Sequence, residues 1–347
     1  MTLVVEHLAE LTGFRDRDLL DVMLVSTLRD LLRPVSVGIY RVVGDARQQH
    51  WLTRARIGEH DTAPAADPLW TELEDLPALH DCPERALCLR EERPIERPPA
   101  APGEPVRLHF PIVTEHEAAG VLEVETSAPM PEEQRRTTAG ILRIYRNFQS
   151  LLDYSERDTL TGLLNRKTFD ECFLRLAVEA ANGEQSRAQG GGRRIANAAF
   201  VHLAVIDIDH FKRVNDLHGH LIGDEVLLLL SRQLRACFRF YDHLFRFGGE
   251  EFVVLVRCAS PQVAPEVFER LRATVAACVF PRVGQVTVSV GMSRLRAGDT
   301  PSAAFERADK ALYWAKQHGR NRVADFEALV AAGELSDAAR TGDVELF

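Results

Sequence analysis

Residues 199–225 read AFVHLAVIDIDHFKRVNDLHGHLIGDE and decide the fold of the C-terminal half. The apolar run over 199–209 predicts a buried strand that ends in acids. Alternation along this strand places Asp207 and Asp209 on one face, with Ile208 between them. Acids where a buried strand meets solvent suit a metal site, a plain strand end or a helix cap, and we expect Asp209 to cap the next helix.

A second stretch, HLFRFGGEEFVVLV (243–256), predicts two strands around a tight Gly248-Gly249 turn. Glycines let a large ligand approach the backbone closely. The adjacent carboxylates Glu250 and Glu251 repel each other unless a cation compensates, and divalent metals carrying a nucleotide triphosphate would do so. Taken alone, the same residues also fit a charged surface turn.

The rest of the C-terminal half alternates between helical and strand patterns. Its further predicted elements are helices over 165–181, 210–217, 223–238, 264–278 and 300–319 and strands over 285–293 and NRVADF (321–326). Between the first of these helices and the buried strand, NGEQSRAQGGGRR (182–194) is predicted to be a loop from its composition. The resulting order, αβααββαβαβ, predicts an α/β (α+β) fold with a mixed sheet and helices on one or both faces.

Several polar residues around these helices could hold a nucleotide. Lys212 lies at a helix start, which favours phosphate. Asn215 and Asp224 offer an amide and a carboxylate, and a carboxylate that accepts from N1–H and the 2-amino group reads guanine. Lys316 and Arg320 are four residues apart across a helix end, where they could clamp outer phosphates or simply complement the helix C-terminus.

The N-terminal half predicts a different domain. A helix is expected over 16–33, a strand over 35–43, and a hairpin over 106–113 and 118–127. The proline-rich stretch 60–105 has little periodicity, so its structure is not predicted.

A helix beginning at Pro131 joins the two halves. Its apolar positions Ile141, Tyr145, Phe148 and Leu152 recur at spacings of three and four, which is typical of a coiled coil. The helix could lie on its own domain's surface, but its place between two domains favours a seam with a second copy.

Composition limits the class of protein. The 347 residues suggest two domains at roughly 150 residues each. A net charge of −9 argues against non-specific binding to nucleic acid or an anionic membrane, and the apolar runs are far shorter than the roughly 18 residues of a membrane span. Six scattered cysteines without a CxxC pair lead us to expect a reduced, cytoplasmic protein.

Together the motifs resemble the GGDEF-domain diguanylate cyclases, in order and separation. The matching segments are DTLTGLLNR (158–166), DIDHFKRVNDLHGHLIGDE (207–225), RFGGEEF (246–252), SVGMS (289–293) and ADKALYWAKQHGRNR (308–322). The resemblance implies a palm-like nucleotidyl-cyclase core. It also implies condensation of two GTP into cyclic di-GMP and two pyrophosphates, with two Mg²⁺ (or Mn²⁺) ions per active site. Because one domain holds one GTP, a homodimer is implied.

The same resemblance assigns roles position by position. It implies metal ligation by Asp207, Glu250 and the Ile208 carbonyl, catalysis by Glu250 and Lys212, and substrate binding by Phe211, Lys212, Asn215, His220, Asp224, Lys316 and Arg320. Arg239-Phe240-Tyr241-Asp242 matches the RxxD inhibitory site for cyclic di-GMP, with Arg270 as a second arginine contact. By itself RxxD is equally consistent with a helix end and a turn.

The N-terminal half more weakly resembles a GAF domain, through its first helix and strand and its closing hairpin. We therefore expect a GAF-like sensory domain (1–130) with an unidentified ligand or signal, a signalling linker helix (131–157), a GGDEF domain (158–327) and a tail (328–347). The alternative is a catalytically inactive GGDEF module that senses GTP or cyclic di-GMP. Asp207, Glu250 and Lys212 are all present, which favours the enzyme.

Overall fold

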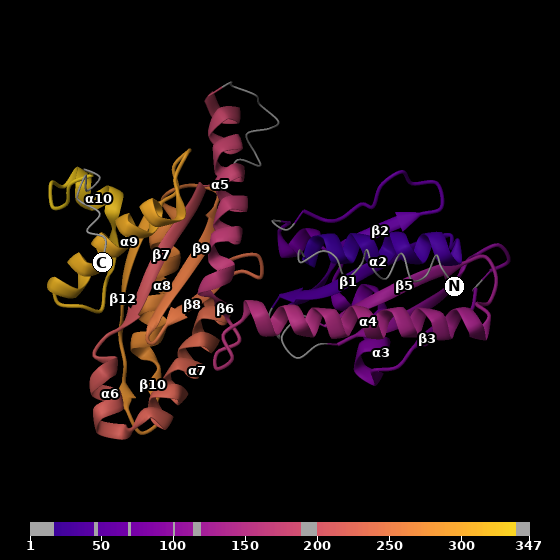
Figure 1. Cartoon of the computed structure of the whole chain (residues 1–347), viewed down its shortest axis with the longest axis horizontal. Coiled ribbons are helices and arrows are strands. Elements are labelled where there is room, and N and C mark those ends of the chain that lie inside the picture. Colours follow the sequence, from indigo (N-terminus) through magenta and orange to yellow (C-terminus); the bar gives the residue numbers. More distant parts are fainter. Residues whose placement is uncertain are drawn as a thin grey trace, which may run out of the picture. The chain divides into compact units, whose positions relative to one another are not determined.

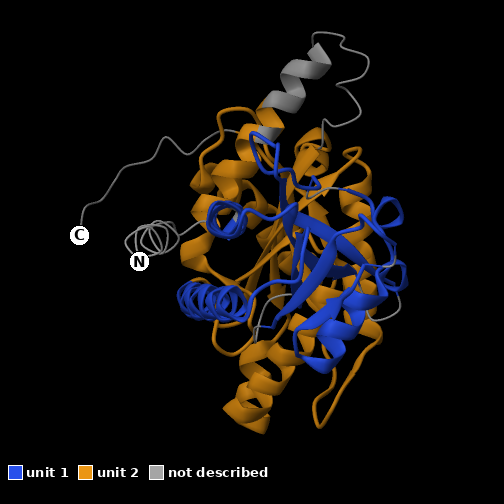
Figure 2. Ribbon diagram, turned by 90° about the vertical axis from the view of Figure 1, so that its right-hand side faces the viewer, with its two compact units in different colours: residues 1–155 blue, residues 156–347 orange. Residues whose placement is uncertain are grey.

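The computed structural model describes residues 17–44, 48–68, 71–99, 101–113, 119–188 and 200–337. The chain divides into two compact units, Met1–Ser155 and Glu156–Phe347, coloured separately in Figure 2. The boundary between them falls inside the segment predicted to be a linker helix. Within the described ranges, every helix is too short or too polar to cross a membrane.

The N-terminal unit is built on a five-stranded antiparallel sheet with the order β2-β1-β5-β4-β3 (Figure 1). Its elements are α2 (Arg17–Leu32), β1 (Ser36–Gly44), β2 (Gln49–Gly58), η1 (Leu73–Asp75), η2 (Leu79–Asp81), α3 (Pro83–Glu91), β3 (Ile95–Arg97), β4 (Val106–Ile112), β5 (Gly120–Thr126) and α4 (Glu132–Glu156). The predicted first helix, first strand and closing hairpin are confirmed. Sequence reasoning missed β2 and the short elements among the prolines.

The two faces of this sheet have different covers. Alternation along β1 directs Ile39 to the core shared with α2 and α4, while the next residue, Tyr40, packs with Trp51 and Cys88 on the other face. That second face carries α3. A sheet covered on both faces needs apolar residues on both, which explains why β1 is buried over most of its length.

The apolar stripe of α4 is buried in its own unit, so the predicted intermolecular seam is wrong. Ile141, Tyr145 and Leu152 belong to the core of the N-terminal unit, and Phe148 packs partly buried against that core. The Tyr145 hydroxyl is buried with Asp21, to which it donates a hydrogen bond. Periodicity identifies the apolar face of a helix but not what covers it.

The C-terminal unit is built on a six-stranded mixed sheet with the order β13-β12-β7-β9-β8-β6. Its strands are β6 (Leu164–Asn165), β7 (Phe200–Ile208), β8 (His243–Gly248), β9 (Glu251–Cys258), β12 (Val288–Arg294) and β13 (Val323–Asp325), with a small separate pair, β10 (Val279–Phe280) and β11 (Gly284–Gln285). Its helices are α5 (Arg166–Ala188), α6 (Phe211–His218), α7 (His220–Cys237), α8 (Val263–Ala277), α9 (Pro301–Gln317) and α10 (Phe326–Ala331).

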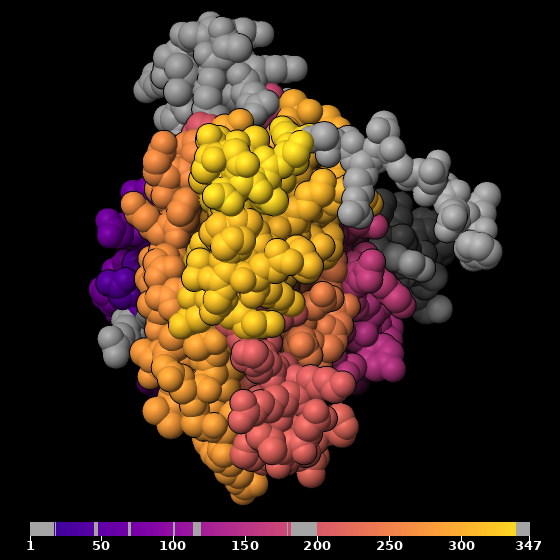
Figure 3. Space-filling model, turned by 90° about the vertical axis from the view of Figure 1, so that its left-hand side faces the viewer, coloured from indigo at the N-terminus to yellow at the C-terminus, as the bar shows by residue number. Residues whose placement is uncertain are grey.

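Helices cover both faces of this sheet. On one face α6, α7 and α8 enclose a core with Ile206 and Phe252, and on the other α5 and α9 pack over Val205 and Val253. Figure 3 looks onto this unit, with the segment of α6 and α7 in salmon and the residues from α9 onward in yellow. The mixed α/β class and the predicted order of the main elements are confirmed.

Two local predictions in this unit need comment. Helix α5 continues to Ala188, so the first residues of the predicted 182–194 loop are helical. The remainder of that loop, 189–194, lies outside the described residues, as does the end of the predicted tail. Very short elements such as β6 and β10 were not predicted, because two residues carry no periodicity.

Candidate active site

The acids predicted from sequence come together at one end of the two central strands of the six-stranded sheet, β7 and β9. Strands β7 and β9 pair antiparallel with Asp207 opposite Glu251, so the end of β7 lies beside the β8–β9 turn. Gly249 in that turn has a φ of +50°, which glycine adopts without strain. A Cβ added at Gly248 or Gly249 would meet no atom within 4 Å. The turn therefore leaves open space next to Asp207 and Glu250.

Lys316 binds one of these acids directly. Its Nζ atom lies 2.9 Å from Oδ2 of Asp207, whose side chain is only 8% exposed. Burial raises the pKa of the Asp207 carboxyl, although the hydrogen bond and the charge of Lys316 act in the opposite direction. Burial and the neighbouring Asp207 carboxylate also raise the pKa of Glu250. The two carboxylates therefore repel each other, and a cation between them is stabilising.

The donor set suits a hard divalent cation that arrives with phosphate. Asp207 and Glu250 have carboxylate oxygens to offer, and Ile208, whose side chain has no ligand atom, could offer only its backbone carbonyl. In the described part of the chain, no three His, Cys, Asp or Glu side chains gather into a group that could hold a metal. Mg²⁺ typically binds one or two protein carboxylates and completes an octahedron with phosphate oxygens and water, which fits this pair.

Asp209 has a different role from the one expected. The first residue before α6 is His210, and it makes no side-chain cap, so the predicted Asp209 cap is wrong. The Asp209 carboxylate instead accepts from Thr287 Oγ1 and Ser289 Oγ, each at 2.7 Å, and from the backbone N–H of Asn321 at 3.0 Å. It therefore braces β7 against β12 and the segment after α9. No sequence signal pointed to these three partners.

Helices α6 and α7 bring together the two residues predicted to contact guanine, Asn215 and Asp224. A Cβ at Gly223 would lie 2.0 Å from Oδ1 of Asn215, so the absence of a side chain at 223 lets the Asn215 amide lie against α7. Asp224 follows on the same helix, and both Asn215 and Asp224 are half-buried. A fixed amide oxygen beside a carboxylate is an arrangement that can accept hydrogen bonds from a guanine edge.

The remaining residues predicted to bind substrate differ in their exposure and in how near they lie to Asp207. The positive charge of Arg320 helps to lower the pKa of the Asp207 carboxyl, which shows that Arg320 lies near this acid. Lys212 in α6 and His220 at the start of α7 are exposed. Phe211 is 4% exposed and belongs to the core, so its contact with a nucleotide is limited to its backbone. Within the described residues, neither Lys212 nor His220 makes a hydrogen bond or ion pair with Asp207 or Glu250.

The predicted inhibitory residues lie around the C-terminal end of α7. The Asp242 carboxylate accepts from the backbone N–H of Arg239 at 2.9 Å, which fixes the turn between α7 and β8. Arg270 donates to the carbonyl of Cys237, two residues before Arg239, at 2.9 Å. The Arg239 guanidinium lies beside the Tyr241 ring. Two arginines and an aromatic ring thus converge at one surface.

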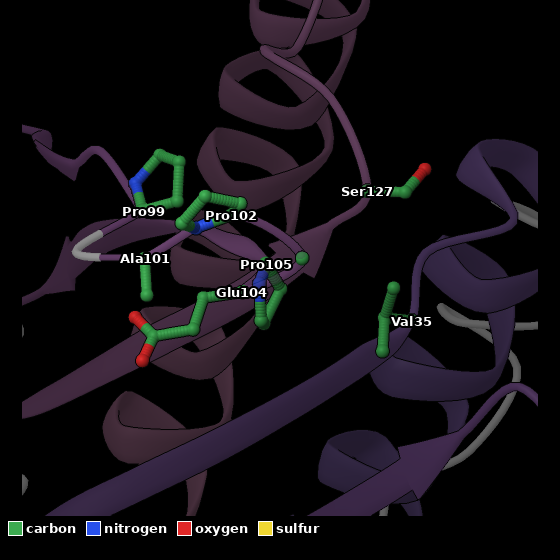
Figure 4. A pocket seen from close by; sticks show the side chains of 8 residues that line it. Val35, Pro99, Ala101, Pro102, Glu104, Pro105 and Ser127 are labelled. Carbon is green, nitrogen blue, oxygen red and sulfur yellow. The ribbon is translucent and has the colours of Figure 1, made fainter.

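A cavity of about 520 Å³ lies elsewhere, in the N-terminal unit (Figure 4). Val35, Pro99, Pro102 and Pro105 are among the residues that line it, and Glu104 is its one ionisable lining residue. None of the predicted site residues contributes to it. The candidate site is therefore the group of acids, cations and open turn in the C-terminal unit rather than this cavity.

The C-terminal unit also matches known proteins. Residues 155–322 match the family model described as "Diguanylate cyclase, GGDEF domain". Diguanylate cyclase DgcP of Pseudomonas aeruginosa is 45% identical over 169 residues, which cover 48% of this chain and 23% of that protein. Diguanylate cyclase DgcM of Escherichia coli is 38% identical over 169 residues, covering 49% of this chain and 38% of that protein. The chain thus spans less than half the length of either relative.

Among solved structures, the coiled coil and GGDEF domain of DgcB from Caulobacter crescentus in complex with c-di-GMP aligns with a TM-score of 0.47 and 30% identity, over 56% of this chain and 97% of that chain. The family match spans the acids of β7 and the β8–β9 turn as well as the cations at the end of α9. Residues 155–322 are therefore a GGDEF domain of the diguanylate cyclase family.

Proposed function

We propose that this chain is a diguanylate cyclase that converts two GTP into cyclic di-GMP and two pyrophosphates. The observation that carries the proposal is the meeting of Asp207, Glu250 and Lys316 beside an open glycine turn. Two carboxylates that need a cation, next to a lysine and an arginine, match the charge of a metal–triphosphate complex.

The chain's own residues would divide the work as follows. Asn215 and Asp224 read the guanine, while Lys212, Lys316 and Arg320 hold the phosphates. Glu250 helps to remove the proton from the attacking 3′-hydroxyl. Asp207, Glu250 and the Ile208 carbonyl would hold two Mg²⁺ or Mn²⁺ ions, which would lower the pKa of that hydroxyl and neutralise the leaving pyrophosphate.

The reaction needs two copies of the domain. Each 3′-oxygen forms a bond to the α-phosphorus of the other GTP, and each α–β phosphate bond breaks to release pyrophosphate. One domain holds one GTP, so two chains must face each other as a homodimer. We further propose that the N-terminal unit is a GAF-like sensory domain that controls this meeting. Its ligand or signal is not identified by its residues.

The deciding assay incubates the purified chain with GTP and Mg²⁺ and measures cyclic di-GMP and pyrophosphate. We expect turnover in the wild type and a loss of at least about a hundredfold in Glu250→Gln, because a site carboxylate at the reacting groups is worth several kcal/mol in the transition state. Glu266→Gln, an exposed change on α8, is the control and should be fully active.

The alternative, an inactive module that senses GTP or cyclic di-GMP, predicts nucleotide binding without turnover. The same preparation decides between the two, because equilibrium binding of either nucleotide together with no product would support the sensor and contradict the cyclase.

A further inference from the structure

Arg246 joins two parts of the C-terminal unit that are far apart in sequence. Its Nη1 atom lies 3.0 and 3.2 Å from the two carboxylate oxygens of Asp158. Its Nε and Nη2 atoms donate to the carbonyl of Gly249 at 3.1 and 2.9 Å. The side chains of Arg246 and Asp158 are 12% and 22% exposed, so water screens this pair less than a surface ion pair.

The partner on one side, Asp158, is itself firmly held. Its carboxylate accepts from the backbone N–H and the hydroxyl of Thr161, at 2.8 and 2.7 Å. Its backbone N–H donates to the carbonyl of Leu163 at 2.8 Å. These bonds close the turn 158–163 on itself, with Asp158 fixed at its start.

This turn is also fixed to the strand that carries Arg246. Strand β6 pairs in parallel with β8, with Asn165 opposite Arg246. From α7, Arg235 donates to the carbonyl of Thr161 at 2.9 Å. Thr168 in α5 donates to the carbonyl of Glu156, the last residue of α4, at 2.9 Å. The end of α4, the turn and β8 therefore form one hydrogen-bonded assembly.

On the other side, the glycine turn is held at its base by the pairing of Gly248 with Glu251, and no side chain of its own restrains its tip. Neither Gly248 nor Gly249 has a side chain, and a Cβ at either would face open space. Two hydrogen bonds from a charged donor to the Gly249 carbonyl are therefore a large part of what can restrain the residue next to Glu250.

We propose that Arg246 is a positioning residue that links the end of α4 to Glu250, through Asp158 on one side and the Gly249 carbonyl on the other. The inference rests on the proposed cyclase function. A displacement of the segment after α4 would shift the Glu250 carboxylate within a single chain, in addition to any change in how two chains meet. The proposed guanine-reading and phosphate-binding residues lie on α6, on α7, on α9 and just after α9, outside this link.

The test uses the full chain and two variants. Asp158→Asn keeps the size of the side chain but removes the charge that faces Arg246. Arg246→Lys keeps the charge but carries all its N–H donors on one nitrogen, whereas Arg246 reaches Asp158 with Nη1 and the Gly249 carbonyl with Nε and Nη2. Arg136→Gln is the matched control, because it breaks an exposed pair with Glu132 at the other end of α4.

We expect both variants to lower kcat at least tenfold while the Kd for an unreactive GTP analogue stays within about twofold of wild type. Amide hydrogen exchange at residues 248–252 should accelerate, with exchange in β7 unchanged. Wild-type kcat in both variants would overturn the proposal, as would an equal loss of analogue affinity and thermal stability. If the wild type itself makes no cyclic di-GMP, the proposed function fails, and the exchange measurement still decides the link.

Discussion

The Nζ atom of Lys316 lies 2.9 Å from Oδ2 of Asp207, so an acid of the proposed metal and triphosphate site already has a cationic partner in the protein itself. When GTP binds, the proposed role of Lys316 requires it to turn from Asp207 to a phosphate. The lysine therefore acts as an internal counter-ion before the nucleotide arrives.

Lys316→Met is predicted to change two affinities in opposite directions. GTP binding should weaken about tenfold to a hundredfold, the size of one lost charged hydrogen bond. Mn²⁺ binding to the nucleotide-free chain, followed by electron paramagnetic resonance, should strengthen because Asp207 is no longer paired. Lys310→Met on the same helix breaks only a surface pair with Glu306 and should change neither. A fall in both affinities would contradict the counter-ion role.

Gly223→Ala is predicted to damage guanine selection without unfolding the domain. The new methyl group would displace the Asn215 amide, a movable side-chain end that lies 2.0 Å from the Cβ position. The KM for GTP should rise about tenfold and the preference for GTP over ATP should fall, since buried polar contacts supply such discrimination. Gly140→Ala in α4, which meets no atom within 4 Å, is the control. Unchanged selectivity would show that Asn215 does not read the base.

Substitution of Arg239 or of Asp242 should relieve product inhibition, but only the change at Asp242 should also lower the stability of the domain. Arg239→Ala is expected to raise the inhibitory concentration of cyclic di-GMP at least tenfold with the melting temperature unchanged, because its guanidinium lies at the surface. Asp242→Ala should relieve inhibition and also lower the melting temperature, since its carboxylate holds the turn at the Arg239 N–H. Inhibition of Arg239→Ala at the wild-type product concentration would refute the site.

Tyr145→Phe tests the finding that α4 is anchored in its own unit. The Tyr145 hydroxyl accepts from Arg41 at 3.0 Å and from Gln149 at 2.8 Å, so its removal takes a hydrogen-bond acceptor from both groups at a buried site. Urea unfolding should show a loss of about 1–3 kcal/mol in the N-terminal transition. Tyr154→Phe, on the same helix and 80% exposed, should cost nothing measurable. Equal stability of the two variants would contradict the anchoring.

Two buried groups in the C-terminal unit should respond to pH with opposite signs. Burial lowers the pKa of His202 to about 4, so its contribution to stability is full above pH 6.5 and is lost as the pH falls toward 4. Burial raises the pKa of Asp242 to about 6, so stability is lost as the pH rises from about 4 to 6.

The matching variants should separate these effects. Relative to wild type, His202→Gln should gain stability as the pH falls from 6.5 to 4. Asp242→Asn should gain stability as the pH rises over the same window. Denaturant unfolding at several pH values measures both slopes, and slopes of the same sign would show that one assignment is wrong.

The sequence predicted the C-terminal unit well because its signals are local. The run before Asp207 and the glycines before Glu250 specify a strand end and a turn by themselves, and pairing of β7 with β9 then brings them together. What it missed depends on contacts between distant segments. Asp209 binds residues about eighty and more than a hundred positions away, and Arg246 binds an acid 88 positions before it. The prediction of an intermolecular seam along α4 was wrong for the same reason, since the apolar face of α4 is covered by residues from distant parts of the chain.

Gly291 in β12 has a consequence for how the site moves. A Cβ there would lie 2.1 Å from the backbone nitrogen of Leu312 and 2.2 Å from the carbonyl oxygen of Ala308, so α9 rests directly on the strand. Because their backbones are packed this closely, α9 and β12 are expected to move together as a rigid unit. The freedom left at the cationic edge lies in side-chain rotamers, which interconvert in picoseconds to nanoseconds. The nucleotide capture proposed for Lys316 and Arg320 would therefore not wait for a movement of the helix, and slower steps would belong to the parts of the protein that are less tightly joined.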